Sequence, residues 1–251
     1  MSAPVYGILC ATVEELDALA GRLDLHPEPR THGATRVWTG RHAGAEIVLA
    51  RAGIGKVNAA AAATLLLDRY EAETLIFSGV AGGLDPDLPV GCVLLADRLA
   101  VHDYGIVTAG RLTPVAYGVI PVGAPPLTEL VAVSEDVARD FRRLAERVAP
   151  RLSGPVRLGG VVTGDYFLNC AETRKRLRGD FRAEAVDMES GAVHQIAEAW
   201  GRRLYVIRTL SDLAGAESHL TYPQMAAMAA ANSAICVVEL LAILQDAPRP
   251  S

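Results

Sequence analysis

Four carboxylates at the ends of apolar runs are the side chains of this chain that are best suited to chemistry. They are Glu15, Asp187, Glu189 and Asp212. Each lies where an apolar stretch typical of a buried strand gives way to a helix or a loop. In an open α/β sheet, ligands bind at the carboxyl ends of the strands. Acids that converge at such an edge predict acid–base chemistry on a small molecule.

The elements that would position these acids follow an alternating pattern. Apolar runs predict strands at residues 5–10, 36–39, 46–51, 74–78, 92–95, 99–101, 156–163 and 204–210. Helical spacing of apolar residues predicts helices at residues 14–23, 57–70, 134–148, 171–177, 190–200 and 225–244. Strands that alternate with helices predict a three-layer α/β domain with a mixed, largely parallel central sheet flanked by helices. Without a repeat or linker, we expect one domain over residues 1–251, with an ordered core over about 4–245.

The composition excludes several classes of protein. Apolar residues make up 51% of the 251 residues, which is enough for a sizeable core. The net charge of −5 argues against a nucleic-acid surface, which needs clustered Lys and Arg. We expect neither a signal peptide nor a membrane span, because no basic segment precedes Val5 and no uninterrupted apolar stretch reaches about 18 residues. The four cysteines form no CxxC pair and predict free thiols in a reducing cytoplasm.

Two glycine-rich segments are candidates for ligand contact. Gly53-Ile-Gly-Lys56 fails as a phosphate-binding loop, because Ala50 and Val57 replace the glycine and hydroxyl residue of that motif. It is either a simple tight turn or a turn that also lines a pocket. Gly79–Gly83 lacks the spacing of a dinucleotide fingerprint, so we expect no nicotinamide or flavin cofactor.

Two histidine-containing segments offer side chains that could bind a metal. Neither His102-Asp103 nor Ser218-His219 has a second ligand at helical or hairpin spacing, so no metal is expected. The segment His102–Pro126 is rich in Gly and Pro and has no pattern of its own. A loop of this length is usually functional.

Eight segments, taken together, resemble the 5′-methylthioadenosine/S-adenosylhomocysteine nucleosidases of the nucleoside phosphorylase superfamily. They are Ala11–Glu15, Ala52–Val57, Ser78–Gly83, His102-Asp103, Gly164–Phe167, Val186–Glu189, Arg208–Asp212 and Ser218–Tyr222. They occur in family order over nearly the whole chain. The resemblance implies a nucleoside phosphorylase-like fold and hydrolysis of the N-glycosidic bond of an adenine nucleoside, with no cofactor.

The resemblance also implies a role for each acid. Asp212 would be the general acid that protonates N7 of the leaving adenine. Glu15 would be the general base that activates water toward the anomeric carbon, and Glu189 would hold the ribose hydroxyls. This division matches glycoside hydrolysis, in which one carboxyl protonates the leaving group and another assists the water.

Further contacts to the substrate are implied for Ile54, Val80, Phe167, Leu168, Met188, Arg208, Ser211 and Tyr222. Phe167 would stack on adenine, and the backbone of Leu168 would read its edge. Met188 would pack beside the sugar, while Ile54 and Tyr222 would cover the 5′ substituent. Arg208 would position both the water and Glu189.

The chain departs from the family pattern at two positions. Val80 stands where many members have a Ser that helps to hold the water. Asp187 replaces the more usual Glu before Met188, and we expect it to support its loop rather than the chemistry. The resemblance further implies a homodimer in which part of His102–Pro126 reaches the neighbouring site.

Several alternatives stay open at this point. A purine nucleoside phosphorylase would place Arg near phosphate, but Ser78–Gly83 has none and Glu15 would repel the anion, so hydrolysis is favoured. Hydrolysis of 6-amino-6-deoxyfutalosine would use the same chemistry with a bulkier 5′ group. A nucleoside-binding module without catalysis would be expected to have lost a carboxylate. The sequence leaves open the 5′ substituent and the pathway, whether methionine salvage, methyl-cycle recycling or menaquinone synthesis.

Overall fold

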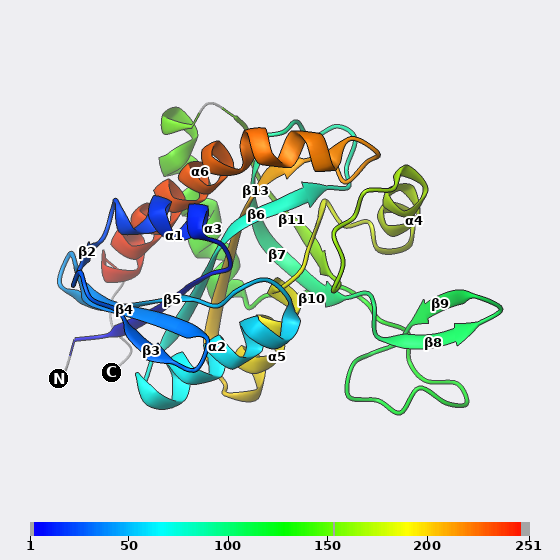
Figure 1. Cartoon of the computed structure of the whole chain (residues 1–251), viewed down its shortest axis with the longest axis horizontal. Helices are drawn as coiled ribbons and strands as arrows, with labels where there is room; N and C mark the ends of the chain where they lie inside the picture. Colours follow the sequence, from blue (N-terminus) through cyan, green and yellow to red (C-terminus); the bar gives the residue numbers. More distant parts are fainter. Residues whose placement is uncertain (1–2, 153, 247–251) are drawn as a thin grey trace.

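A mixed β-sheet covered by helices forms the molecule in a computed structural model that describes residues 3–152 and 154–246 (Figure 1). The strands are β1 (Val5–Cys10), β2 (Asp24–Leu25), β3 (Arg30–His32), β4 (Thr35–His42), β5 (Ala45–Arg51), β6 (Thr74–Gly83), β7 (Val93–Val101), β8 (Gly105–Thr108), β9 (Arg111–Pro114), β10 (Val131–Ala132), β11 (Val156–Thr163), β12 (Ala185–Asp187) and β13 (Arg203–Asp212). The helices are α1 (Val13–Ala20), α2 (Lys56–Arg69), α3 (Glu135–Val148), the short 3₁₀ helix η1 (Ala149–Arg151), α4 (Ala171–Phe181), α5 (Ser190–Ala199) and α6 (Ser218–Asp246).

The strands of the main sheet pair in the order β10-β7-β11-β12-β6-β1-β5-β4-β2, and β13 joins both β6 and β7. β1 is parallel to β5 and β6, β13 is parallel to β6, and β11 is parallel to β7 and β12. The other pairs of this sheet are antiparallel. The predicted α/β fold with a mixed sheet and flanking helices is confirmed. The single domain over 1–251 stays a prediction, and its residues 1–2, 153 and 247–251 lie outside the described residues.

Two hydrophobic cores lie on opposite faces of the sheet. Because strand side chains alternate between faces, Ile8 of β1 joins the core beneath α1, α3 and α6, whereas Leu9 joins the core beneath α2 and α5. Figure 1 shows α1 and α6 on one side of the strands and α2 and α5 on the other. The helices therefore hold the strand ends in fixed positions on both faces.

The closing helix α6 is longer than the expected 225–244, because it begins at Ser218 and continues through Pro223. Its length and apolar character would suit a membrane span, but most of its apolar window is buried within the fold. It packs against α1, α3, β6 and β13. In the described residues, α6 is a core helix.

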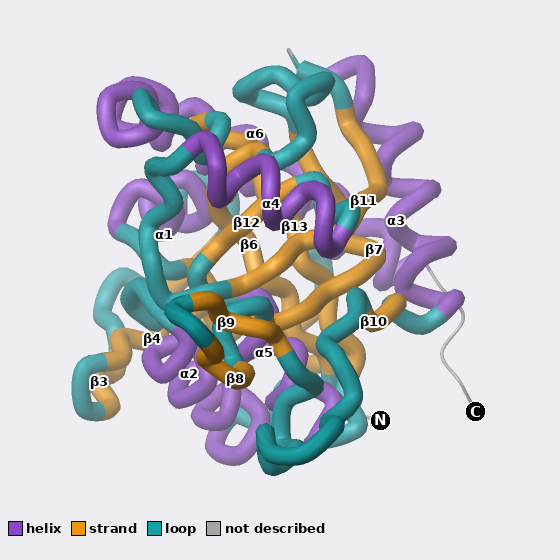
Figure 2. The backbone as a smooth tube through the Cα atoms, turned by 90° about the vertical axis from the view of Figure 1, so that its right-hand side faces the viewer, coloured by secondary structure: helices purple, strands orange, loops and turns teal. Residues whose placement is uncertain are grey.

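Three other elements differ from expectation for identifiable reasons. β6 continues through Gly79–Gly83, which the glycines had suggested was a loop. β7 is one strand, since the polar residues at 97 and 98 only interrupt its pattern. The segment His102–Pro126 contains the hairpin of β8 and β9, whose turn at Ala109-Gly110 has positive φ angles, as tight hairpin turns require. Figure 2 shows this hairpin on the face toward the viewer.

The core beneath α3 gives the first prediction. Phe141 is fully buried, and its ring meets that of Tyr205 edge to face, with 5.5 Å between centroids. We expect Phe141→Ala to lower the free energy of unfolding by about 3–5 kcal/mol in urea denaturation, because it leaves a cavity. The exposed Val107→Ala is the control and should be close to neutral. A loss below about 1 kcal/mol for Phe141→Ala would contradict this packing.

Candidate active site

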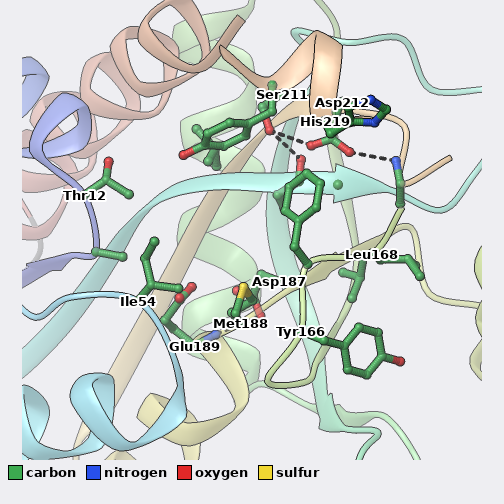
Figure 3. Close-up of a pocket in the computed structure, with 18 of the residues that line it drawn as sticks. Thr12, Ile54, Tyr166, Leu168, Asp187, Met188, Glu189, Ser211, Asp212 and His219 are labelled. Atoms are coloured by element: carbon green, nitrogen blue, oxygen red, sulfur yellow. Dashed lines mark hydrogen bonds between the residues drawn. The ribbon is translucent and has the colours of Figure 1, made fainter. Parts of the chain in front are cut away.

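A cavity of about 460 Å³ opens at the carboxyl ends of the central strands (Figure 3). Ten of the eleven residues that the sequence predicted as a site line its wall: Glu15, Ile54, Val80, Phe167, Leu168, Met188, Glu189, Ser211, Asp212 and Tyr222. The eleventh, Arg208, is fully buried behind that wall. The fold thus brings all of these residues together, while their roles stay predictions.

The guanidinium of Arg208 is the buried cation of the site. Its Nη2 lies 2.7 Å from Asp187 Oδ2 and 3.5 Å from Glu189 Oε2, and its Nε donates to Asp187 at 2.9 Å. The guanidinium also lies over the ring of Phe77, with the carbon 4.0 Å from the centroid. Burial opposes the charge, but Asp187, Glu189 and Glu15 outweigh burial and raise the pKa of Arg208.

The Asp187 carboxylate accepts hydrogen bonds from several neighbouring residues. Its Oδ1 accepts a hydrogen bond from Thr163 Oγ1 at 2.5 Å, and Oδ2 accepts from the hydroxyl and the amide of Ser190. Oδ2 also accepts the hydrogen bond from Arg208 Nε. The short Asp side chain is therefore saturated by partners and fixes the orientation of Arg208.

Glu189 is the N-cap residue of α5, and its carboxylate reaches across to another helix. Oε1 accepts from the backbone N–H of Gly55 at 2.9 Å, at the start of α2. Burial raises the pKa of Glu189 to about 7; the charge of Arg208 opposes this shift, and that of Asp187 adds to it. Burial therefore favours the protonated form of Glu189 more than it does for an exposed Glu.

Glu15 is fixed by the local structure at the start of α1. Thr12 and Glu15 form a capping box, in which Glu15 Oε2 also accepts from the N–H of Ala11 at 2.6 Å. The other oxygen, Oε1, accepts from the backbone N–H of Val80 at 3.1 Å. Val80 thus contributes its backbone to the site, although its side chain cannot make hydrogen bonds.

Gly79 explains why β6 carries glycine at this point. A Cβ there would collide with Arg208 Nη1 and with Glu15 Oε1, so both atoms lie on the same side of the strand. Nη1 is buried and has no hydrogen-bond partner among the described residues. A buried donor of this kind is a place where a ligand or a water is expected to bind.

Asp212, at the end of β13, lies across the cavity from Glu189 (Figure 3). Its Oδ1 accepts from the N–H of Ala214 at 2.8 Å, and Oδ2 accepts from Ser211 Oγ at 3.0 Å. The Asp212 side chain is 2% exposed. Two donors therefore orient a buried carboxyl group that still faces the cavity.

Aromatic and apolar side chains form the rest of the wall. Phe167 meets Tyr222 edge to face, with 5.9 Å between their centroids, and Phe167 is about half exposed. Ile54 is also half exposed at the mouth, whereas Leu168 is buried. These surfaces suit a flat ring and an apolar substituent.

Other residues of the cavity were not predicted from the sequence. Thr12, Tyr166 and His219 also line it. The Thr-x-x-Glu spacing of Thr12 and Glu15 is a capping-box signal that could have been recognised. Among residues 3–152 and 154–246, no group of three or more His, Cys, Asp or Glu is arranged to hold a metal ion.

Comparisons with known proteins place the chain in a family. Residues 5–242 match the family model described as the phosphorylase superfamily. A relative from Mycobacterium bovis, a 5′-methylthioadenosine/S-adenosylhomocysteine nucleosidase, is 38% identical over 259 residues, covering 96% of this chain and 98% of the relative. One from Geobacillus thermodenitrificans with the same name is 36% identical over 95% of this chain and 97% of its own length. The chain belongs to the 5′-methylthioadenosine/S-adenosylhomocysteine nucleosidase family of the phosphorylase superfamily.

Solved structures of nucleosidases share the fold. A Neisseria meningitidis member in complex with methylthio-immucillin-A has a TM-score of 0.80 and 29% identity, with 94% of this chain and 98% of that chain covered. A futalosine hydrolase from Helicobacter pylori has a TM-score of 0.80 and 27% identity, over 96% of this chain and 98% of that chain. The nucleoside phosphorylase-like fold that the resemblance implied is confirmed.

The environment of Glu189 gives a prediction that needs no substrate. We expect its side-chain carboxyl carbon to titrate with a midpoint near pH 7 in ¹³C NMR, because burial disfavours the charged form. The signal is assigned by its loss in Glu189→Gln. A midpoint near that of an ordinary Glu, about 4.3, would show that Arg208 and the Gly55 amide outweigh burial.

Proposed function

We propose that this protein hydrolyses the N-glycosidic bond of 5′-methylthioadenosine and S-adenosylhomocysteine, releasing adenine and a 5-substituted ribose. One observation carries the proposal: Glu15, Glu189 and Asp212, from three separate elements, line one largely apolar cavity. Neither Lys nor Arg is among the residues that line it. A phosphorylase would need an uncompensated cation for its phosphate, whereas the charge of Arg208 behind the wall is paired with Asp187 and Glu189, so the site favours water as the nucleophile.

The base side of the reaction belongs to Asp212. Protonation at N7 makes adenine a better leaving group, and a carboxyl group fixed by Ser211 and the Ala214 amide suits that transfer. Phe167 stacks on the ring, and the backbone of Leu168 reads its edge. The proton thus comes from Asp212 and leaves with adenine.

The water side belongs to Glu15 and Arg208. Glu15 Oε1 and Arg208 Nη1 face the same region beside Gly79. A water there would donate to Glu15 and accept from Arg208. Glu15 then takes the proton of the water as oxygen attacks the anomeric carbon. Val80 fixes Glu15 through its backbone amide, a role that does not require the Ser common at this position.

The sugar side belongs to Glu189 and Met188. Glu189 accepts from the ribose hydroxyls, and Met188 packs beside the ring. As the bond breaks, the ribose gains oxocarbenium character, which nearby carboxylates stabilise. Ile54 and Tyr222 cover the 5′ substituent at the mouth of the cavity.

Removal of the acid tests the assignment of Asp212. We expect Asp212→Asn to lower kcat for 5′-methylthioadenosine by about 10²–10⁴-fold, the usual contribution of a general acid, with a small change in KM. Adenine release is followed by absorbance or chromatography. The matched control is Asp136→Asn, the same change at an exposed position of α3. Full turnover by Asp212→Asn would show that another group supplies the proton.

The assay with and without phosphate separates the alternatives. We expect the same rate of adenine release in both, because water is the nucleophile. Strict dependence on phosphate would favour a phosphorylase. A panel of 5′-methylthioadenosine, S-adenosylhomocysteine and 6-amino-6-deoxyfutalosine then ranks the 5′ groups. A preference for the last would favour the activity of the futalosine hydrolase relative.

A second copy of the chain is the partner that the surface suggests. Val57 is 80% exposed at the start of α2, and Ile120 is 74% exposed in the 102–126 segment. The pair of Lys56 with Asp103 brings these two regions next to each other. Exposed apolar side chains on two neighbouring segments are candidates for an association site. We therefore propose a homodimer in which the 102–126 segment approaches the neighbouring cavity.

A charge placed on this surface tests the homodimer. We expect Val57→Asp to shift the mass measured by light scattering from dimer to monomer, because a buried unpaired carboxylate is costly. Thr31→Asp on β3, far from the β8–β9 hairpin in Figure 1, is the control and should leave the mass unchanged. A wild-type protein that is already a monomer would refute the proposal.

The four free cysteines support a reducing location. We propose that the enzyme acts in the cytoplasm.

A further inference from the structure

Three charged residues that the proposed mechanism does not use lie together next to the cavity residues Ile54 and Tyr166. Lys56, from the Gly53–Lys56 turn, lies beside Asp103, from the pair His102-Asp103, and beside Asp165. We propose that Lys56, Asp103 and Asp165 form an ionic latch that positions the adenine-binding loop and Glu189 for the reaction. The inference rests on the proposed function, and none of the three residues touches the reacting atoms.

The latch connects three loops that follow β5, β7 and β11. Lys56 Nζ pairs with Asp103 Oδ1 and lies 3.6 Å from Asp165 Oδ2. The backbone N–H of Asp165 donates to Asp103 Oδ2 at 2.7 Å, and the N–H of Lys56 donates to Asp165 Oδ1 at 2.9 Å. Each member therefore contacts both of the others.

The charges make Lys56 the essential member. Asp103 and Asp165 are two adjacent carboxylates, and Lys56 is the cation between them. The side chains of Lys56 and Asp103 are only 23% and 15% exposed, so water screens their interaction weakly. Without the ammonium group, the two carboxylates would repel each other and the loop after β11 would move away from Asp103.

The latch is connected to the site through two consecutive backbone amides at the start of α2, those of the N-cap Gly55 and of Lys56. The N–H of Gly55 donates to Glu189, and the N–H of Lys56 donates to Asp165. Asp165 precedes Phe167 by two residues and Leu168 by three, so its position fixes the loop that holds adenine. A shift at the start of α2 would therefore disturb the ribose ligand and the adenine loop together.

The ring of His102 packs against the same loop at Gly164. A Cβ at Gly164 would collide with the His102 ring, which leaves the loop little room to move in that direction. Burial lowers the pKa of His102 to about 4, so the neutral ring adds no charge to the latch. The loop is thus packed on one side and tied by charge on the other.

The test compares matched lysine substitutions. We expect Lys56→Met to lower kcat/KM for 5′-methylthioadenosine by about tenfold or more, because small displacements of positioning groups are costly. KM should rise through Phe167 and Leu168, and kcat should fall through Glu189. Lys56→Arg keeps the cation and should restore most of the loss. Lys175→Met, at an exposed position of α4, is the control and should change nothing.

A second variant keeps the test independent of the stability of the first. Asp103→Asn should cause a similar loss, and the double variant should lose less than the sum of both, because they act through one interaction. If both single variants stay within about twofold of the wild type, the latch has no positioning role. If Lys175→Met loses as much as Lys56→Met, the effect is not specific to the latch.

Hydrogen exchange separates this inference from the proposed function. Lys56→Met should increase amide exchange in residues 53–58 and 164–170, relative to the wild type and Lys175→Met, whatever the substrate is. A wild type that releases no adenine overturns the proposed function. Unchanged exchange in these two segments overturns the latch.

Discussion

The buried contact of Arg208 with Asp187 and Glu189 is the constraint on which the arrangement of the site depends. Arg208 is fully buried, and a buried cation is tolerated only with well-placed partners. Asp187 supplies one partner at the end of β12, and Glu189 supplies another at the start of α5. Phe77 covers the guanidinium, and Gly79 leaves room for it. Loss of Asp187 or Glu189 would leave the buried charge of Arg208 without a partner, and a side chain at position 79 would collide with it.

The strands next to this contact also position Asp212 and Glu15. Arg208 is on β13, four residues before Asp212, so one strand carries both the buried cation and a carboxyl group that lines the cavity. β6 lies beside β13 and places the Val80 amide against Glu15. The positions of the strands and of the helix N-termini therefore set the separation between the three acids. Burial at the start of α5 raises the pKa of Glu189 to about 7.

Local patterns in the sequence were enough to predict much of this fold. The bounds of β1 and β11 were predicted to the residue, because a proline precedes each apolar run and the runs end before the helix cap Thr12 and before Gly164. The end of β6 was not predicted, because glycines are poor strand residues. Gly79 is needed there because the side chains of Arg208 and Glu15 lie too close to leave room for a Cβ. The β8–β9 hairpin was missed because its strands are short and largely exposed.

The members of the site were predicted more completely than their contacts. A family resemblance names residues, but it does not report that Asp187 orients Arg208 or that Gly55 binds Glu189. Those contacts join positions that are 21 and 134 residues apart. They depend on which strands become neighbours, a property of the whole sheet. The shorter arm of Asp187 works here because Thr163 and Ser190 complete its hydrogen bonds.

A crystal structure of this protein with methylthio-immucillin-A, the ligand of the Neisseria relative, is the most direct test of the account. We expect the Asp212 carboxyl at hydrogen-bond distance, about 2.7–3.2 Å, from N7 of the base. Glu189 should contact the sugar hydroxyls, and a water should bridge Glu15 Oε1 and Arg208 Nη1. A complex in which the base lies away from Asp212, or in which the sugar faces Asp212 instead of Glu189, would contradict the division of roles among the acids.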